Sequence, residues 1–209
     1  MLNGIPGKKL GMSQLFDTEG KAIPVTVVDV GTWYVTQVKT SEKDGYCSLQ
    51  VGLPRKRYQK ISFSPEWLKK KGDFFLYVKE IKQVDSKHSF AVGQKITLDD
   101  VTLQEGAVVA VTGQSRGLGF QGVVRRWGFA GGPKAHGSKF HRRPGTSGCL
   151  RTQGEIIKGK KFPGHMGAVQ VTVEGLNVVK IDKGAGCLFI KGALPGKKDS
   201  LVIVNKQGI

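Results

Sequence analysis

Six residues near the middle of the chain match the glycine pattern of a dinucleotide-binding turn. Gly117-Leu118-Gly119-Phe120-Gln121-Gly122 has the G-x-G-x-x-G spacing and follows a strand-like run. Such a turn needs a helix directly after it and an acidic residue about 20 positions further on. Gly128 and Gly131-Gly132-Pro133 break any helix that begins here, and the acidic position falls in Lys139-Phe140-His141-Arg142. We therefore expect these glycines to allow close backbone approach to phosphates, or a sharp turn, and not to bind a dinucleotide.

Three histidines and a cysteine in the same region could in principle ligate zinc. They are His136, His141, Cys149 and His165, and they extend over 30 residues. Structural zinc sites usually take their ligands from two tight pairs, and this set has no second pair. We expect no metal and no cofactor, and we expect the histidines to donate to phosphates or to stack on bases.

A catalytic group in this region would lack the carboxylate that normally orients it. No Asp or Glu occurs between Glu105 and Glu155, and Thr146, Ser147 and Cys149 have no carboxylate–histidine pair nearby in the sequence. We expect the chain not to be an enzyme and to have no small-molecule substrate. The alternative is a nucleotide-binding enzyme that uses residues 117–122, which would bind a dinucleotide in the absence of RNA.

Positive charge is the chemistry that this region offers most. The chain has 33 Lys and Arg against 16 Asp and Glu, a formal charge of +17. Residues 113–167, here called the basic segment, hold eleven basic residues, one acidic residue (Glu155) and fourteen of the 30 glycines. So local an asymmetry is typical of a binding element rather than of an evenly solvated surface.

Nucleic acid is the polyanion that fits the basic segment best. Lys and Arg neutralise phosphates, and aromatic rings can stack on bases. Candidate rings are Trp127, Phe129, Phe140, His141 and Phe162, each of which could equally pack within the protein. The basic residues alternate with Gly and Pro and line no amphipathic helix, so we expect no membrane partner. No zinc-finger, helix-turn-helix or RRM motif is present, which favours folded RNA, with a general architectural nucleic-acid protein as the alternative.

The basic segment has too few apolar residues to fold by itself. Ordering the backbone costs roughly 1–2 kcal/mol per residue, whereas fully burying one large apolar side chain returns about 1.5–3 kcal/mol. Its apolar residues are widely separated and keep no helical period. We therefore expect the segment to become ordered only against a partner.

The rest of the chain has the pattern of a small β-barrel or sandwich. Short strands are expected at residues 25–30, 33–36, 108–111, 169–174, 176–181, 187–190 and 201–204, with hairpin turns at 17–20 and 183–186. A short helix is expected at 64–69, with Ser64 as N-cap and Pro65 in its first position. The sequence has no apolar run of 18 residues and no signal-peptide pattern, and its scattered Cys47, Cys149 and Cys187 indicate a reducing, cytoplasmic compartment.

Motifs along nearly the whole chain resemble the bacterial form of a ribosomal protein family, L-three of the large subunit. The matching runs are Gly7–Phe16, Ile23–Val27, Thr112–Gly117, Gly119–Gly122, Arg125–Phe129, Gly132-Pro133, His136-Gly137, His141–Gly145, Lys158–Lys161 and Gly164–Gly167. They match in order and in spacing, and as a set they are highly specific.

The resemblance implies a mainly β fold, namely a six-stranded translation-protein-type β-barrel with a peripheral α/β insertion and a long basic, Gly-rich arm. Residues 1–112 and 168–209 would form the barrel body, 54–95 a loosely structured insertion in it, and 113–167 the arm. It further implies a cytoplasmic ribosomal protein that binds large-subunit rRNA near its 3′ end and nucleates early assembly. Its partners would be that rRNA and neighbouring large-subunit proteins, and its arm would extend toward the peptidyl-transferase centre.

Two sets of site residues follow from the charge pattern and the resemblance together. The rRNA-binding set is Arg116, Arg125, Arg126, Trp127, Lys134, His136, Lys139, His141, Arg142, Arg143, Arg151, Lys158, Lys160, Lys161 and His165. The set at the arm tip, near the peptidyl-transferase centre, is Gly145, Ser147, Gly148, Cys149 and Leu150. Many bacterial members carry a methylated glutamine where this chain has Cys149, so that modification is not expected here.

Overall fold

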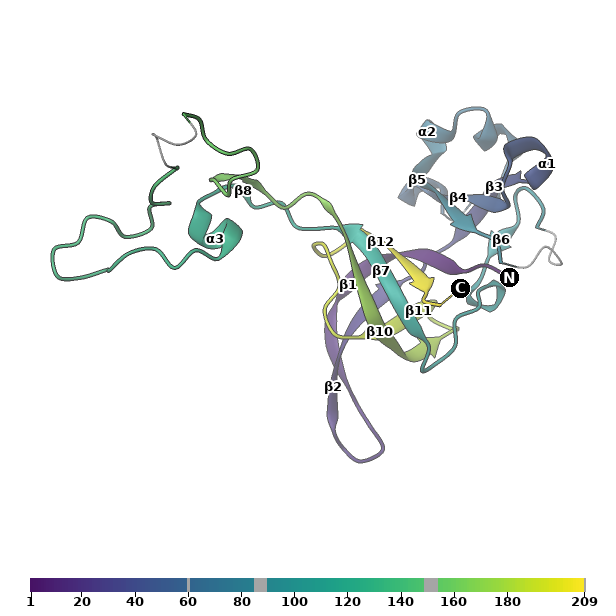
Figure 1. Ribbon diagram of the computed structural model, residues 1–209. Helices are drawn as coiled ribbons and strands as arrows, with labels where there is room; N and C mark the ends of the chain where they lie inside the picture. Colours follow the sequence, from purple (N-terminus) through teal and green to yellow (C-terminus); the bar gives the residue numbers. More distant parts are fainter. Residues whose placement is uncertain (60, 85–89, 149–153, 209) are drawn as a thin grey trace. The chain divides into compact units, whose positions relative to one another are not determined.

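The computed structural model describes residues 1–59, 61–84, 90–148 and 154–208, most of them in strands and loops (Figure 1). The chain forms two units. One contains Met1–Gln114 and Gln170–Ile209, and the other, inserted in the sequence of the first, contains Ser115–Val169. Among the described residues, no helix is both long enough and apolar enough to cross a bilayer.

Six antiparallel strands of the first unit close into a barrel, in the order β1-β12-β7-β10-β11-β2. Their bounds are β1 Gly4–Phe16, β2 Ala22–Asp29, β7 Val108–Gln114, β10 Gln170–Asp182, β11 Cys187–Lys191 and β12 Leu201–Lys206. The expectation of a mainly β fold with a six-stranded barrel is therefore confirmed.

Alternating side chains fill the barrel, as expected for strands with one face in a core. Val109 and Val111 of β7 are fully buried, as are Val202 and Val204 of β12. Glycines let β1 pack tightly against the strands beside it. A Cβ at Gly4 would lie 2.2 Å from the carbonyl oxygen of Val204, so only glycine fits there without displacing backbone.

A second sheet of the same unit has the strand order β5-β4-β3-β6 and shares one buried core with the barrel. It consists of β3 Trp33–Lys39, β4 Ser48–Pro54, β5 Phe75–Lys82 and β6 Lys95–Ile96. Short helices lie between these strands or follow them: α1 Ser41–Asp44, η1 Lys56–Tyr58, η2 Pro65–Leu68, α2 Lys71–Phe74 and η3 Leu98–Asp100. Trp33 is fully buried and donates from Nε1 to the carbonyl of Val30 at 2.6 Å.

The structure corrects three local expectations. The strands expected at 169–174 and 176–181 are one strand, β10, whose pairing with β7 shifts register between Val173 and Leu176. Strand β1 was not expected from the pattern, because its glycines and lysines hide the alternation. The helix at 64–69 is a 3₁₀ helix with Pro65 in its first turn, and the Ser64 side chain makes no capping hydrogen bond.

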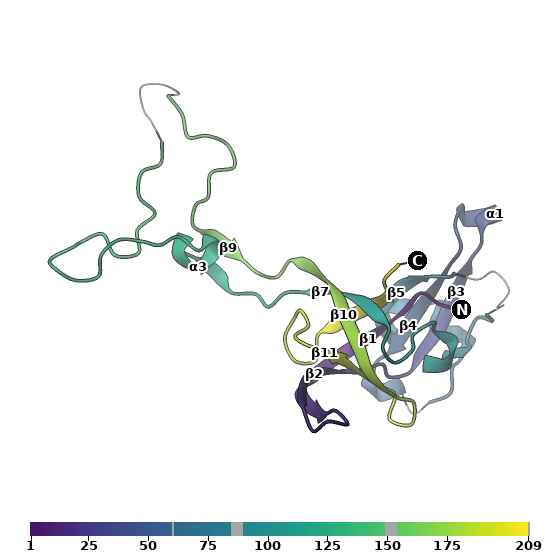
Figure 2. The same ribbon diagram turned by 60° about the horizontal axis from the view of Figure 1, so that its bottom comes forward.

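In the part of the second unit that the structure describes, three short elements are found, and Figure 2 labels α3 and β9. They are β8 Gly119–Gln121, α3 Val123–Trp127 and β9 Gly164–Met166. Strands β8 and β9 pair antiparallel as a two-stranded sheet. One helix does therefore follow the glycine motif, against expectation, but Gly128 ends it after five residues with φ 73°.

Candidate nucleic-acid interface

A two-stranded ladder joins the two ends of the second unit. Strand β8 pairs with β9 from Gly119–Met166 to Gln121–Gly164. The backbone N–H of Ser115 donates to the Val169 carbonyl at 2.8 Å, and that of Leu118 donates to Met166 at 2.9 Å. The glycine motif thus supplies one strand of this β8–β9 hairpin, and the helix after it, α3, has only five residues, too few for the crossover helix of a dinucleotide-binding unit.

A cluster around Trp127, here called the tryptophan cluster, holds two cations beside this hairpin. Both Arg126 Nη1 and Trp127 Nε1 donate to the Phe162 carbonyl, at 2.8 and 2.9 Å. The Arg126 guanidinium lies 4.9 Å from the Trp127 ring centroid and the Lys161 ammonium 5.6 Å from it, both within cation–π range. Trp127 and Phe162, which are 35 positions apart in the sequence, are thereby in contact. The Trp127 side chain is 42% exposed.

The loop beyond α3 is held by contacts among its own backbone and Phe140. The backbone N–H of Gly132 donates to the His141 carbonyl at 2.7 Å, and the backbone N–H of Arg143 donates to the Phe140 carbonyl at 3.2 Å. The Phe140 ring lies so close to Gly132 that a Cβ there would overlap it. His136 and His141 both adopt positive φ, of 56° and 48°. The side chains on this loop therefore project from a backbone whose conformation is fixed by its own hydrogen bonds and by the Phe140 ring.

The candidate contact residues of the second unit are largely exposed. Arg126 is partly buried in the tryptophan cluster, whereas the others in the described part are exposed: Arg116, Arg125, Trp127, Lys134, His136, Lys139, His141, Arg142, Arg143, Lys158, Lys160, Lys161 and His165. Gly145, Ser147 and Gly148 are also exposed. Arg151, Cys149 and Leu150 lie outside the described residues.

No carboxylate neutralises these cations in the part of the chain that the structure describes. The ion pairs found there, Lys39–Glu80 and Lys183–Asp99, are both in the first unit. Glu80 accepts from Lys39 at 2.7 Å, and this hydrogen bond, more than any other contact, lowers the pKa of Glu80. Exposed cations without internal counterions are available to a polyanionic partner.

Sequence reasoning missed one exposed ring in this region. Phe120 of β8 is 76% exposed, more than the other large apolar side chains in the described part of the chain. The available signal was Gly119 directly before it, since a glycine has no side chain that could cover the ring. An exposed aromatic ring among cations is suited to stacking on an unpaired base.

Features that would indicate an enzyme are weak in the described structure. No group of three His, Cys, Asp or Glu residues is arranged to hold a metal ion within the described ranges. Burial raises the pKa of the Cys187 thiol, and Asp29 and Asp182 raise it further, so this thiol stays protonated near neutral pH.

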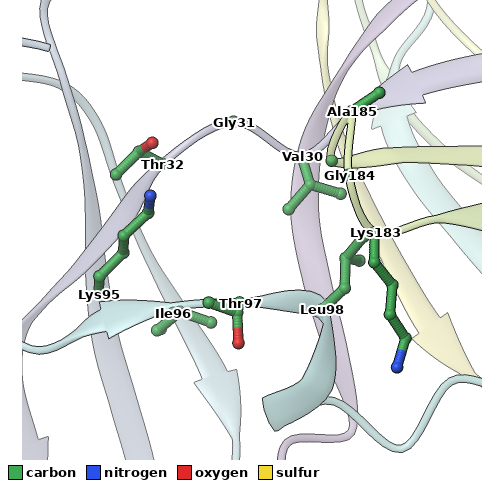
Figure 3. A pocket seen from close by; sticks show the side chains of 11 residues that line it. Val30, Gly31, Thr32, Lys95, Ile96, Thr97, Leu98, Lys183, Gly184 and Ala185 are labelled. Atoms are coloured by element: carbon green, nitrogen blue, oxygen red, sulfur yellow. The ribbon is translucent and has the colours of Figure 1, made fainter.

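A hollow of about 270 Å³ in the first unit also lacks catalytic groups (Figure 3). Lys95 and Lys183 lie on opposite sides of it, and the Lys183 ammonium is bound to Asp99. Its remaining lining is backbone, threonine and apolar side chains, with neither a histidine nor a cysteine. It provides no nucleophile–base pair.

Comparison with known proteins identifies the family. The family model described as ribosomal protein L3 matches residues 67–187. The chain belongs to the ribosomal protein L3 family. Large ribosomal subunit protein uL3 of Syntrophotalea carbinolica is 46% identical over 210 residues, which cover 99% of both chains. The uL3 proteins of Bdellovibrio bacteriovorus and Alkaliphilus metalliredigens are each 43% identical, over 96% and 99% of this chain and 91% and 100% of their own.

Membership of the ribosomal protein L3 family sets the general role of the chain. Proteins of this family are structural and non-enzymatic, and they act in translation within the cytoplasmic ribosome. The resemblance seen in the sequence motifs is thereby confirmed, as is the expectation that the chain is not an enzyme. The geometry of the second unit supplies the candidate residues for contact with RNA.

One glycine of the hairpin gives a test of its geometry. Gly167 has φ 80°, and a Cβ built there would lie 2.1 Å from the Arg116 carbonyl oxygen. Strain of about 1–3 kcal/mol at such a position predicts that Gly167→Ala weakens binding to an rRNA fragment by roughly five- to 150-fold. The matched control is Gly122→Ala, because a Cβ there meets nothing within 4 Å. Filter binding measures both, and equal affinities would show that the hairpin does not shape the interface.

Proposed function

We propose that this L3-family protein is a structural component of the large ribosomal subunit that binds large-subunit rRNA near its 3′ end. The first unit acts as the body, against which neighbouring large-subunit proteins pack. The basic segment acts as the arm: it binds rRNA, becomes ordered against it and extends toward the peptidyl-transferase centre. Binding of this kind places the protein among those that nucleate early assembly of the subunit.

The observation that carries this proposal is the set of exposed cations in the second unit that no carboxylate in the described structure neutralises. Each Lys or Arg that meets a phosphate releases condensed counterions, which makes the binding favourable and dependent on salt. Fourteen of the 30 glycines lie in the basic segment. Because glycine has no side chain, these positions allow the backbone to approach phosphates closely. Cations, glycines and exposed rings together favour folded RNA over a regular duplex.

Two sets of residues have separate roles in the proposal. The fifteen basic, histidine and tryptophan positions identified from the sequence, including Arg151, are the proposed rRNA contacts. Residues 145–150 are the proposed tip; in their described part, Gly145 has φ 85° and Thr146 Oγ1 donates to the Gly148 carbonyl at 3.3 Å. A turn without charge adds little electrostatic affinity, so its role is steric placement.

A competition experiment tests the proposal against both alternatives. The full chain is bound to a transcript of the 3′-terminal domain of large-subunit rRNA and challenged with duplex DNA of equal length. We expect the rRNA transcript to be preferred by at least about a thousandfold, as specific sites are over non-specific ones. Equal binding to DNA would support a general architectural protein. Binding of a dinucleotide by the RNA-free chain would instead support the nucleotide-binding enzyme.

A further inference from the structure

A second group of cations lies in the first unit, between β4 and β5. Residues 55–74 form an excursion whose ends meet, because Pro54 of β4 pairs with Phe75 of β5. This excursion contains seven basic residues and two acidic ones. The six described basic residues, here called the insertion patch, are Arg55, Lys56, Arg57, Lys69, Lys70 and Lys71.

Specific hydrogen bonds bring the two basic runs of the insertion patch together. The Arg55 backbone N–H donates to the Phe74 carbonyl at 2.9 Å, and Arg55 Nη2 donates to Gly72 at 2.8 Å. Lys71 Nζ donates to Gln50 Oε1 at 2.6 Å. The run at 55–57 is therefore tied to the residues that directly follow the run at 69–71.

An aromatic core holds the excursion in this shape. Trp67 is only 4% exposed and stacks on Phe74 at 5.8 Å between ring centroids, with an interplanar angle of 9°. Tyr58 packs against the same Phe74 ring at 5.0 Å, and the Arg57 guanidinium lies 4.8 Å from the Tyr58 ring centroid. Since these rings anchor the backbone of both basic runs, the cationic side chains start from defined positions, and binding needs ordering of side chains but little ordering of the chain.

The cations of the insertion patch lack acidic partners within the described structure. Glu66 and Asp73 lie in the same excursion, yet neither forms an ion pair there. Lys56, Lys69 and Lys70 are exposed, and their ammonium groups donate to no other described residue. Arg55 and Lys71 help to hold the fold, so the three lysines, with Arg57, are the groups available to a ligand.

We propose that the insertion patch is a second phosphate-binding site for structured RNA, carried by the body and separate from the second unit. This inference rests on the proposed function, because the RNA is that of the same subunit. Cations carried on an anchored backbone match phosphates held at fixed positions in folded RNA. A membrane surface fits less well, since the helices of the excursion have three or four residues and form no amphipathic face.

A charge-matched pair of variants tests this site in the full chain. The patch variant carries Lys56→Gln, Lys69→Gln and Lys70→Gln, which spares Arg55 and Lys71. The control variant carries Lys21→Gln, Lys43→Gln and Lys198→Gln, three exposed lysines elsewhere in the first unit with the same loss of charge. Affinity for the 3′-domain rRNA transcript is measured by filter binding from 50 to 200 mM KCl, and near-UV circular dichroism confirms that both variants are folded.

We expect the patch variant to lower the slope of log affinity against log salt by about two to three, because each phosphate that is no longer neutralised reduces the slope by roughly 0.7–0.9. The control variant should leave the slope within about 0.5 of the unaltered chain. Equal slopes for patch and control variants would overturn the proposal, and the patch would then face protein or solvent. If Arg142→Ala with Arg143→Ala also leaves the slope unchanged, the proposed function fails as well, so the two failures are distinguishable.

Discussion

Replacing residues 116–168 by a two-residue Asn-Gly turn is expected to stop assembly of the large subunit at an early particle. All eleven basic residues of the basic segment are removed, out of 33 in the chain. The body should still fold, because Ser115 and Val169 are joined by a backbone hydrogen bond of 2.8 Å and an Asn-Gly turn can close a hairpin there. Sucrose-gradient profiles of cells that carry only this variant measure the outcome.

Point variants at the tip give the contrasting result that separates anchoring from placement. Gly148 is exposed, and a Cβ there would meet nothing within 4 Å, so Gly148→Val should not disturb the protein itself. We expect nearly normal subunits with altered peptidyl transfer or antibiotic response, measured on purified particles. If Gly148→Val blocks assembly as severely as the replacement does, the tip is an anchor and the two roles are reversed.

The barrel could be predicted from sequence where its strands are β-branched and alternate. In runs such as residues 108–111 and 201–204, the residue types alone indicate a strand with a buried face, and both runs lie in strands of the barrel. Strand β1 carries no such pattern, and a register shift between Lys9 and Gly11 interrupts its pairing with β2. In the sequence, Gly175 suggests a turn between two strands. In the structure it has φ 72°, and β10 continues through it at a register shift. Glycine marks a change of backbone geometry, and whether that is a turn or a bulge depends on the neighbouring strand.

The candidate site was predictable in composition but not in arrangement. The eleven basic residues between 113 and 167 stand out in the sequence, whereas the tryptophan cluster depends on a backbone carbonyl, that of Phe162, which no side-chain pattern reports. The insertion patch was missed for a related reason. In the sequence, each of its two basic runs is typical of a solvated surface. Only the pairing of β4 with β5 brings the two runs together.

Affinity for the rRNA transcript is expected to fall by about a thousandfold or more between 50 and 200 mM salt. This drop corresponds to roughly six to ten phosphates neutralised by Lys and Arg. The second unit offers enough exposed cations for most of these contacts, with the insertion patch as a further source. The measurement is filter binding of the full chain over that salt range.

Two variants at Arg142 and Arg143 assign part of this slope to the basic segment. Both side chains are exposed, and nothing in the described structure pairs with their guanidinium groups, so removing them leaves no buried group unsatisfied. Arg142→Ala with Arg143→Ala should lower the slope by about one for each phosphate that these arginines neutralise. Arg142→Lys with Arg143→Lys keeps the charge and should keep the slope, while affinity falls if the planar guanidinium fork matters. A slope near zero for the unaltered chain would mean that apolar docking dominates, and the electrostatic account of this interface would be wrong.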